Sequence, residues 1–303
     1  MTVLEVLQWA SLKLKSNFTA PAPETDTPLL DAELLLATAM KVQKTWLFAH
    51  FNDPVRACEL ELFEQLLNRR LGGEPVAYLT QKKDFFGRSF FINPFVLIPR
   101  PATETLVEEA IHETSTVGEH PLLIDIGTGS GVIAITLAAE TGLPIFASDK
   151  DPHALAIAKK NAQIHNVQDF IEFQTGHLLD PLEKCILSLK ERLKIVFTDL
   201  IICANLPYLS TNEWKKTHLS VQQFEPKHAL EAGQDGLELY WELLHSLKLY
   251  RDHFPKQIRC LFEIGPSQNK QIIQIGKHLF PLASFCIKKD LEGHERIFIL
   301  KEI

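Results

Sequence analysis

Hydrophobic residues recur along this chain with two different periods, and the change of period divides the chain. Before residue 74 they return every three or four positions, which predicts amphipathic helices over 29–39 and 59–71. Pro28 is typical of the first turn of a helix, and Gly72 of a helix end. The beginning of the chain therefore predicts a small helical region.

Residues 74–98 have a different pattern. Aromatic and β-branched residues cluster there around Gly87 and around Asn93-Pro94, which predicts a β-hairpin. The segment Pro99-Arg100-Pro101 then interrupts the hairpin, and a helix is expected from Thr103 onward.

From residue 121 onward, short apolar runs alternate with amphipathic stretches. Strands are expected at 122–126, 145–148, 170–174, 195–203 and 258–264, with a last strand around 298–299. Helices are expected at 132–140, 152–165, 236–250 and 267–279. Such alternation predicts an α/β fold, in which helices cover both faces of a parallel sheet.

Three regions follow from these patterns. We expect an N-terminal helical domain over 1–73, a β-hairpin and linker over 74–120, and an α/β domain over 121–303.

Composition and charge narrow the classes of function. Hydrophobic residues make up 46% of the 303 residues, the net charge is −7, and the pI is about 6.0. This does not resemble a general nucleic-acid binder, so we expect no direct nucleic-acid binding. The five scattered cysteines have no metal-ligand spacing, so we expect neither a disulfide framework nor a metal site. No signal peptide or apolar run of roughly 20 residues is present, which favours a cytoplasmic protein without membrane contact.

A glycine-rich loop follows the first strand of the α/β region. It reads Asp125-Ile126-Gly127-Thr128-Gly129-Ser130-Gly131, and the next strand ends at Asp149. The spacing is G-x-G-x-G rather than the G-x-G-x-x-G of dinucleotide binders, and Asp125 would repel a pyrophosphate. A carboxylate at the position of Asp149 can accept hydrogen bonds from both hydroxyls of a ribose. The loop and the carboxylate together favour a nucleotide-like, cationic cofactor such as S-adenosylmethionine.

A second polar loop, Asn205-Leu206-Pro207-Tyr208, follows the strand expected at 195–203. Ligands of open α/β sheets bind beyond the carboxyl ends of the strands. Asn205 offers an amide, Pro207 keeps Leu206 extended, and Tyr208 offers a flat ring. These groups are suited to gripping a planar NH2 group. The alternative interpretation is a strand-end turn in which Asn205 caps the backbone and Tyr208 packs.

These two loops together resemble those of Rossmann-like class I methyltransferases that act on adenine, cytosine or glutamine NH2 groups. Upstream, Ile98-Pro99-Arg100-Pro101-Ala102-Thr103-Glu104 matches the I-P-R-P-x-T-E signature of the HemK/PrmC family. Downstream segments continue this likeness: Phe224-Glu225-Pro226, Ala229-Leu230, Asp235-Gly236 and Glu263-Ile264-Gly265.

The resemblance implies a peptide-chain release factor glutamine N5-methyltransferase. The implied fold is a Rossmann-like methyltransferase sheet with a small N-terminal helical domain, which would dock the substrate, and a linking β-hairpin. The implied activity is methyl transfer from S-adenosylmethionine to the glutamine of the Gly-Gly-Gln loop of release factors. The implied catalytic residues are Asn205, Leu206, Pro207 and Tyr208; the cofactor residues are Asp125, Gly127, Thr128, Gly129, Ser130, Gly131, Asp149, His177 and Asn205.

The chain departs from the family pattern at three positions. Leu206 replaces a proline, but it keeps the backbone carbonyl to which the role belongs. Gly176 replaces an acidic residue expected to contact the adenine edge; His177 either stacks on the adenine or has no role there. Ala102 replaces an acidic residue within the I-P-R-P-x-T-E segment.

The mechanism implied is alignment rather than deprotonation, because no carboxylate is expected around Asn205 and an amide nitrogen is a poor nucleophile. Two other functions stay open from the residues alone. One is N6-adenine methylation of rRNA or DNA, because Asn-Leu-Pro-Tyr also resembles rRNA adenine dimethyltransferases. The other is a non-catalytic protein that keeps the cofactor fold.

Overall fold

The computed structural model describes residues 1–16, 27–182, 191, 194 and 196–302. By its internal contacts the chain divides into two compact units, each described by itself below. Unit 1 comprises Met1–Lys82, Ile92–Pro94 and Lys216–Glu225, and unit 2 comprises Lys83–Phe91, Phe95–Lys215 and Pro226–Ile303. In the part of the chain that is described, no helix has the length and apolar character needed to cross a membrane.

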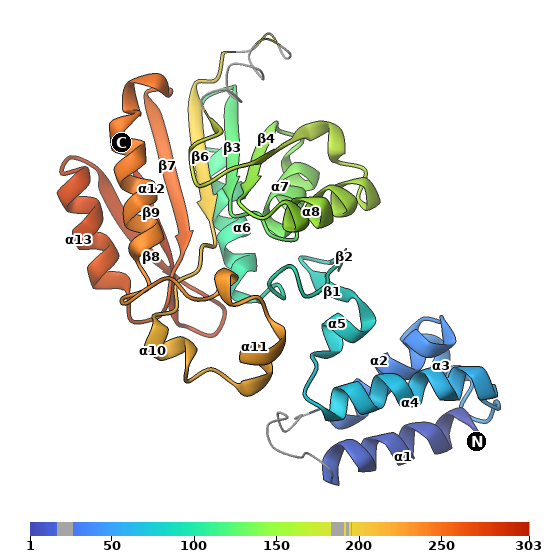
Figure 1. Cartoon of the computed structure of the whole chain (residues 1–303). Coiled ribbons are helices and arrows are strands. Elements are labelled where there is room, and N and C mark those ends of the chain that lie inside the picture. The colour runs from blue at the N-terminus through green and yellow to red at the C-terminus, as the bar shows by residue number, and fades with distance from the viewer. Residues whose placement is uncertain (17–26, 183–190, 192–193, 195, 303) are drawn as a thin grey trace. The chain divides into compact units, whose positions relative to one another are not determined.

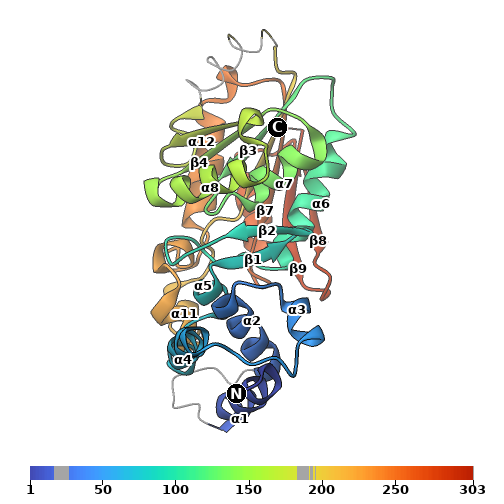
Figure 2. The ribbon, with the colours of Figure 1, turned by 90° about the vertical axis from the view of Figure 1, so that its right-hand side faces the viewer.

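Unit 1 is helical, and both helices expected there are confirmed with small shifts of their ends (Figure 2). Its helices are α1 (Val3–Ser16), α2 (Pro28–Met40), α3 (Lys44–Ala49), α4 (Ala57–Leu71), α5 (Val76–Thr80) and α11 (Leu219–Phe224). Pro28 occupies the first turn of α2, where its missing N–H is not needed, and Gly72 caps α4.

Helix α2 is held to α1 and α4 by an apolar core of leucine, alanine and phenylalanine side chains. One buried ion pair crosses this core, because Arg70 of α4 donates to the Asp31 carboxylate of α2 at 2.8 Å. Both side chains are 9% exposed, so each charge depends on the other for compensation.

Unit 2 is an α/β layer structure, and the predicted class is confirmed (Figure 1). Its strands are β3 (Pro121–Ile126), β4 (Ile145–Asp149), β5 (Ile171–Thr175), β6 (Asp199–Ala204), β7 (Gln257–Glu263), β8 (Ser284–Lys289) and β9 (Glu295–Lys301). Their order in the sheet is β5-β4-β3-β6-β7-β9-β8. The first five strands are parallel, whereas β9 is antiparallel to both of its neighbours.

Helices cover both faces of this sheet, as predicted. In Figure 1, α12 and α13 lie on one side, and α6, α7 and α8 lie on the other. The helices are α6 (Ala102–Thr114), α7 (Val132–Thr141), α8 (Pro152–Ile164), α10 (Thr211–Trp214), α12 (Glu238–Leu249) and α13 (Asn269–Leu279). Short 3-10 turns cover Gln168–Phe170, Lys227–Ala229 and Arg251–His253.

The continuous apolar runs of β3 and β6 are explained by burial on both faces. Leu122 and Ile124 belong to the core under α12 and α13, whereas Leu123 between them belongs to the core under α6 and α7. Successive side chains of a strand point to opposite faces, so a strand between two helix layers needs no polar alternation.

The hairpin consists of β1 (Lys82–Phe85) and β2 (Arg88–Phe91), which turn at Gly87. Glu104 of α6 accepts a hydrogen bond from the Phe86 backbone N–H at 2.7 Å. On the other strand, the Asn161 side chain of α8 pairs with the Phe91 backbone at 2.8 and 2.9 Å. The hairpin is therefore fixed to the helices of unit 2.

Several expected elements differ from the structure. The strand expected at 195–203 begins at Asp199, and Val196 before it is 73% exposed. Ile195, at the start of that expectation, lies outside the described residues. The hairpin strands occupy only 82–91 of the region expected at 74–98, and α5 lies in the first part of that region. Strand β8 and the helices α1, α3, α10 and α11 were not individually expected.

Candidate active site

The glycine loop leads from β3 into α7 and is tied to the neighbouring strand. The backbone N–H groups of Gly127 and Thr128 both donate to the Ser148 carbonyl of β4, at 2.8 and 2.9 Å. Gly129 has a φ of 55°, and Gly131, which caps α7, has a φ of 86°. Residues with a Cβ rarely adopt such angles, so glycine is what allows this tight path.

Asp125 lies beneath the loop and is fully buried. Its Oδ2 accepts from the Thr128 hydroxyl at 2.6 Å and from the Ala134 N–H at 3.1 Å. Burial disfavours the charged form and raises the pKa of Asp125 to about 7. The structure thus places Asp125 as a support that joins the loop to α7.

Asp149 ends β4 and holds the loop from the side. Its Oδ2 accepts from the Gly129 N–H at 2.9 Å, and its Oδ1 accepts from the Asp151 N–H at 2.9 Å. Burial raises the pKa of Asp149 above its ordinary value. Each carboxylate oxygen keeps a further lone pair with which it can accept from a ligand hydroxyl.

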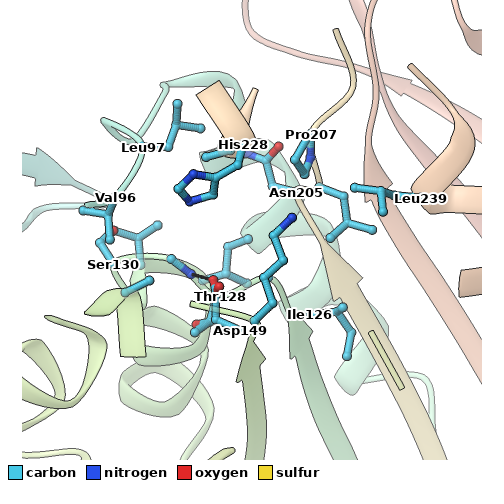
Figure 3. Close-up of a pocket in the computed structure, with 18 of the residues that line it drawn as sticks. Val96, Leu97, Ile126, Thr128, Ser130, Asp149, Asn205, Pro207, His228 and Leu239 are labelled. Atoms are coloured by element: carbon cyan, nitrogen blue, oxygen red, sulfur yellow. Dashed lines mark hydrogen bonds between the residues drawn. The ribbon is translucent and has the colours of Figure 1, made fainter. Parts of the chain in front are cut away.

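A cavity of about 110 Å³ opens at the carboxyl ends of β3, β4 and β6 (Figure 3). In Figure 3, Thr128 and Asp149 lie across the cavity from Asn205 and Pro207. Of the predicted site residues, the following line it: Gly127, Thr128, Gly129, Ser130, Asp149, His177, Asn205, Leu206 and Pro207. Asp125, Gly131 and Tyr208 are not among its lining residues.

The cavity also has lining residues that the sequence did not single out. Phe95, Val96 and Leu178 add apolar wall, and Lys150 follows Asp149 at the rim. His228 extends toward the cavity from the turn after α11, and its Nε2 lies 3.8 Å from an Asp151 carboxylate oxygen. The A-L segment of the predicted signature, Ala229-Leu230, directly follows His228 and was the signal that could have pointed to it.

The tetrapeptide after β6 is held at its first two residues. The Asn205 side chain donates through Nδ2 to the Thr103 hydroxyl at 3.0 Å. The Leu206 backbone N–H donates to the Tyr240 hydroxyl at 3.1 Å, and Tyr240 in turn donates to the Glu263 carbonyl at 2.5 Å. Tyr240 is fully buried in α12, so this contact fixes the backbone where the tetrapeptide leaves the sheet.

Tyr208 faces a second cavity, of about 280 Å³, which it lines with Glu263 and Arg100 among others. Its carbonyl accepts from the Gln268 side chain at 2.8 Å. A Cβ on Gly236 would stand 2.1 Å from that carbonyl, so only glycine fits there. This close approach explains the Asp-Gly pair in the downstream signature.

The expectation that no carboxylate lies around Asn205 is wrong. Glu263 is 1% exposed, and its Oε2 accepts from the Thr103 hydroxyl at 2.6 Å. Because Asn205 donates to the same hydroxyl, the Thr103 side chain alone separates Glu263 from Asn205. Its Oε1 accepts from the Tyr208 hydroxyl at 3.3 Å. Burial raises the pKa of Glu263, while the Thr103 hydroxyl and nearby Arg296 oppose that rise. The signal was present in the sequence, because both Thr103 and Glu263 belong to the signature segments.

Comparisons with known proteins agree with this arrangement. Residues 5–80 match the family model of the PrmC N-terminal domain, and residues 102–205 match that of the ribosomal protein L11 methyltransferase, PrmA. The release factor glutamine methyltransferase of Bacillus cereus is 30% identical over 300 residues, which are 98% of each chain. That of Nitratidesulfovibrio vulgaris is 38% identical over 283 residues, covering 92% of this chain and 90% of the relative.

The chain belongs to the release factor glutamine methyltransferase family.

The predicted resemblance is thereby confirmed, and with it the methyltransferase class. Among solved structures, the hMettl16 catalytic domain in complex with the MAT2A 3'UTR hairpin 1 superposes with a TM-score of 0.52 at 18% identity. This match covers 72% of our chain and 75% of the other, and it shows the shared fold alone.

As a methyltransferase of this family, the protein uses S-adenosylmethionine. The residues that line the cavity beside the glycine loop fit that cofactor. The cavity combines close backbone, one carboxylate at a strand end and apolar walls. A Cβ on Gly127 would come within 3.0 Å of the Leu206 side chain and would narrow it. Gly127, Gly129 and Asp149 are the residues that would hold the cofactor.

Two departures from the family pattern have local physical reasons. A Cβ on Gly176 would stand 2.7 Å from the Pro181 ring, so an acidic side chain cannot be placed there without moving the following turn. His177 beside it pairs with Glu242 at 2.9 Å and is half-exposed. Ala102 lines the second cavity together with Arg100, and its methyl side chain occupies less of that cavity than an acidic side chain would.

Proposed function

We propose that this protein transfers the methyl group of S-adenosylmethionine to the side-chain amide nitrogen, N5, of the glutamine in the Gly-Gly-Gln loop of peptide-chain release factors. The observation that carries the proposal is the place of the tetrapeptide. Asn205 lines the cavity formed by the glycine loop, whereas Tyr208 lines the second cavity. A group gripped between these residues would meet a cofactor from one side and an acceptor chain from the other.

The proposed chemistry is alignment. The amide nitrogen of glutamine is a poor nucleophile because its lone pair is delocalised into the carbonyl. The Asn205 side-chain oxygen and the Leu206 carbonyl would accept its two hydrogens and direct the lone pair at the methyl group. The cofactor supplies an electrophilic methyl on a positively charged sulfur. As the N–C bond forms, the bond between sulfur and the methyl carbon breaks and leaves a neutral thioether. The methylated nitrogen is then acidic and loses one proton.

Tyr208 has a supporting part in this proposal. Its ring would pack on the plane of the acceptor amide and exclude water. Burial and the charge of Glu263 raise the pKa of Tyr208, so the hydroxyl stays neutral and keeps donating to that carboxylate. A neutral ring held at a fixed angle suits a planar neutral substrate.

We infer further that the N-terminal helical domain, residues 1–73, docks the body of the release factor, and that the reaction takes place in the cytoplasm. The described cysteines are free thiols, which fits a reducing compartment. If docking contributes, an intact release factor will have a much lower KM than a short Gly-Gly-Gln peptide, with a similar kcat.

The test uses the purified protein with radiolabelled S-adenosylmethionine and two acceptors. One is a recombinant release factor, and the other is the same factor with the loop glutamine replaced by alanine. Label on the first and not on the second supports the proposal. Label on neither, together with label on rRNA or DNA, would overturn it in favour of adenine methylation.

A further inference from the structure

Three segments far apart in the sequence meet beside the tetrapeptide. Thr103 lies at the start of α6, Asn205 follows β6, and Glu263 ends β7. Asn205 Nδ2 lies 3.0 Å from Thr103 Oγ1, which lies 2.6 Å from Glu263 Oε2. Thr103 is 2% exposed and Glu263 is 1% exposed, so bulk water does not compete for these contacts.

The direction of the hydrogen bonds along this chain is fixed by its last member. A carboxylate only accepts, and a hydroxyl has one proton to donate. The 2.6 Å separation between Thr103 and Glu263 is that of a charge-assisted bond to a carboxylate. The Thr103 proton is therefore committed to Glu263, and the Thr103 oxygen can only accept from Asn205.

An amide has two different ends, so this constraint sets its orientation. Only the NH2 end of Asn205 can donate to Thr103, which leaves the Oδ1 end for the substrate. If Thr103 were free to donate, the side chain could turn over and present its NH2 group. Two donors would then face the two N–H bonds of an acceptor amide.

We propose that Glu263, acting through Thr103, is a positioning residue that orients the Asn205 side chain so that its oxygen faces the acceptor glutamine. This inference rests on the proposed function of Asn205. Neither Glu263 nor Thr103 exchanges a proton with the substrate in this role, so the carboxylate acts only by accepting.

Burial raises the pKa of Glu263, but the groups around it oppose that rise and so support the charged form that this role needs. These groups are the Thr103 and Tyr208 hydroxyls and the cationic Arg100 and Arg296. Arg296 is itself held by Asp290 at 3.3 Å. The same carboxylate therefore holds both polar side chains of the tetrapeptide, Asn205 through Thr103 and Tyr208 directly.

The competing explanation is that Thr103 and Glu263 only fasten α6 to β7. Three variants separate the two explanations. Thr103→Ser keeps the hydroxyl, Thr103→Val keeps the shape without it, and Glu263→Gln allows the neighbouring hydroxyl to donate elsewhere.

We expect Thr103→Ser to retain its kcat on a release factor. Thr103→Val and Glu263→Gln should each lower kcat by about 10- to 100-fold, the loss expected when a reacting group is misplaced. Their affinities for S-adenosylmethionine should stay near that of the unchanged protein, and their melting temperatures should stay above the assay temperature. The double variant should be no slower than the slower single variant, because both changes break one chain of contacts. Unchanged kcat in Thr103→Val, or equal losses in Thr103→Ser and Thr103→Val, would overturn the inference.

A second measurement does not depend on activity. Hydrogen exchange of the Asn205 side-chain amide, followed by NMR in the cofactor-free protein, should be slow in the unchanged protein and in Thr103→Ser. It should be faster in Thr103→Val and Glu263→Gln. Equal exchange in all four proteins would overturn the positioning role. Slow exchange in a protein that does not methylate release factors would refute the proposed function and leave the positioning role standing.

Discussion

Asp125 and Glu263 are both fully buried carboxylates, on the two strands that flank β6, yet they hold very different partners. Asp125 accepts from Thr128 and Ala134, three and nine residues further along the chain. Glu263 accepts from Thr103 and Tyr208, which are 160 and 55 residues away. One carboxylate shapes a local loop, and the other joins three distant segments.

The difference separates two tasks within one sheet. Asp125 supports the backbone that would hold a cofactor, so substitutions near it should lower the affinity for the cofactor. Glu263 supports the side chains that would bind an acceptor, so substitutions near it should lower kcat. Variants on the two sides should therefore divide into two kinetic classes.

The largest effect is expected from Asn205→Ala, at the Glu263 side. Removal of the aligning oxygen should lower kcat by about 100-fold or more, because the acceptor amide loses its orientation. Affinity for S-adenosylmethionine, measured by isothermal titration, should change little. Gln163→Ala, on the exposed surface of α8 and outside both cavities, is the matched control and should behave like the unchanged protein. Wild-type turnover in Asn205→Ala would remove the distinction between the two sides.

A smaller effect is expected from Asp149→Ala, at the cofactor side. This change releases the Gly129 N–H and removes the carboxylate that we expect to accept from the ribose hydroxyls, so cofactor affinity should fall by about 10- to 100-fold. The kcat at saturating cofactor should stay within a few-fold. Asp169→Ala, at an exposed position, serves as the control. A fall in kcat without a change in affinity would place Asp149 in the other class.

The third prediction concerns pH. Asp125 keeps its proton up to about pH 7 in the folded protein, against an ordinary value of 3.8. The folded state thus binds more protons than the unfolded state between these values, so the free energy of unfolding should fall as pH rises toward 7. The contribution is at most about 1.4 kcal/mol per pH unit, and it should level off above pH 7.

Urea unfolding of the unchanged protein and of Asp125→Asn over this pH range measures that contribution. The free energy of unfolding of Asp125→Asn should fall less steeply with rising pH than that of the unchanged protein. Burial also raises the pKa of Glu263, so Glu263→Gln should shift the profile in the same direction. Parallel profiles for all three proteins would contradict the prediction.

The smallest effect is expected from His177→Ala. His177 lines the cofactor cavity, but it is half-exposed and already pairs with Glu242. An exposed ion pair contributes only about 0–1 kcal/mol to stability, so losing it should disturb the cavity wall little. The affinity for S-adenosylmethionine should therefore change by less than about fivefold. Glu242→Ala should give a similar result. A tenfold or larger loss in His177→Ala alone would instead support stacking on the adenine.

Local chemistry decided which features could be predicted. The glycine loop, Asp149 and the tetrapeptide each follow a buried strand directly, so their place at the edge of the sheet could be inferred from a few neighbouring residues. The contacts of Glu263 could not be inferred this way, because they depend on how β7, β6 and α6 come together. The location of Tyr208 on a separate cavity also depends on tertiary structure.

The strand errors have a similar origin. Strand β8 lies at the edge of the sheet, and its residues from Ser284 to Lys289 are only partly buried, so it lacks a continuous apolar run. Residues 196–198, before β6, belong to such a run but do not form a strand, and Val196 is largely exposed. The apolar pattern thus identified the buried strands, but it missed the exposed edge strand β8 and misplaced the start of β6.

The position of β9 has a consequence for how the enzyme is made. Strand β9 is the last in the sequence, yet it pairs with β7 on one side and β8 on the other. During synthesis the strand that ends in Glu263 therefore lacks a hydrogen-bonded neighbour on one side until residues 295–301 have left the ribosome. Because domains fold only as their parts emerge, a nascent chain that carries every residue of the tetrapeptide would still lack a completed sheet behind it. Catalytic competence would then arise in one step once β9 has emerged and paired, rather than gradually as the chain lengthens.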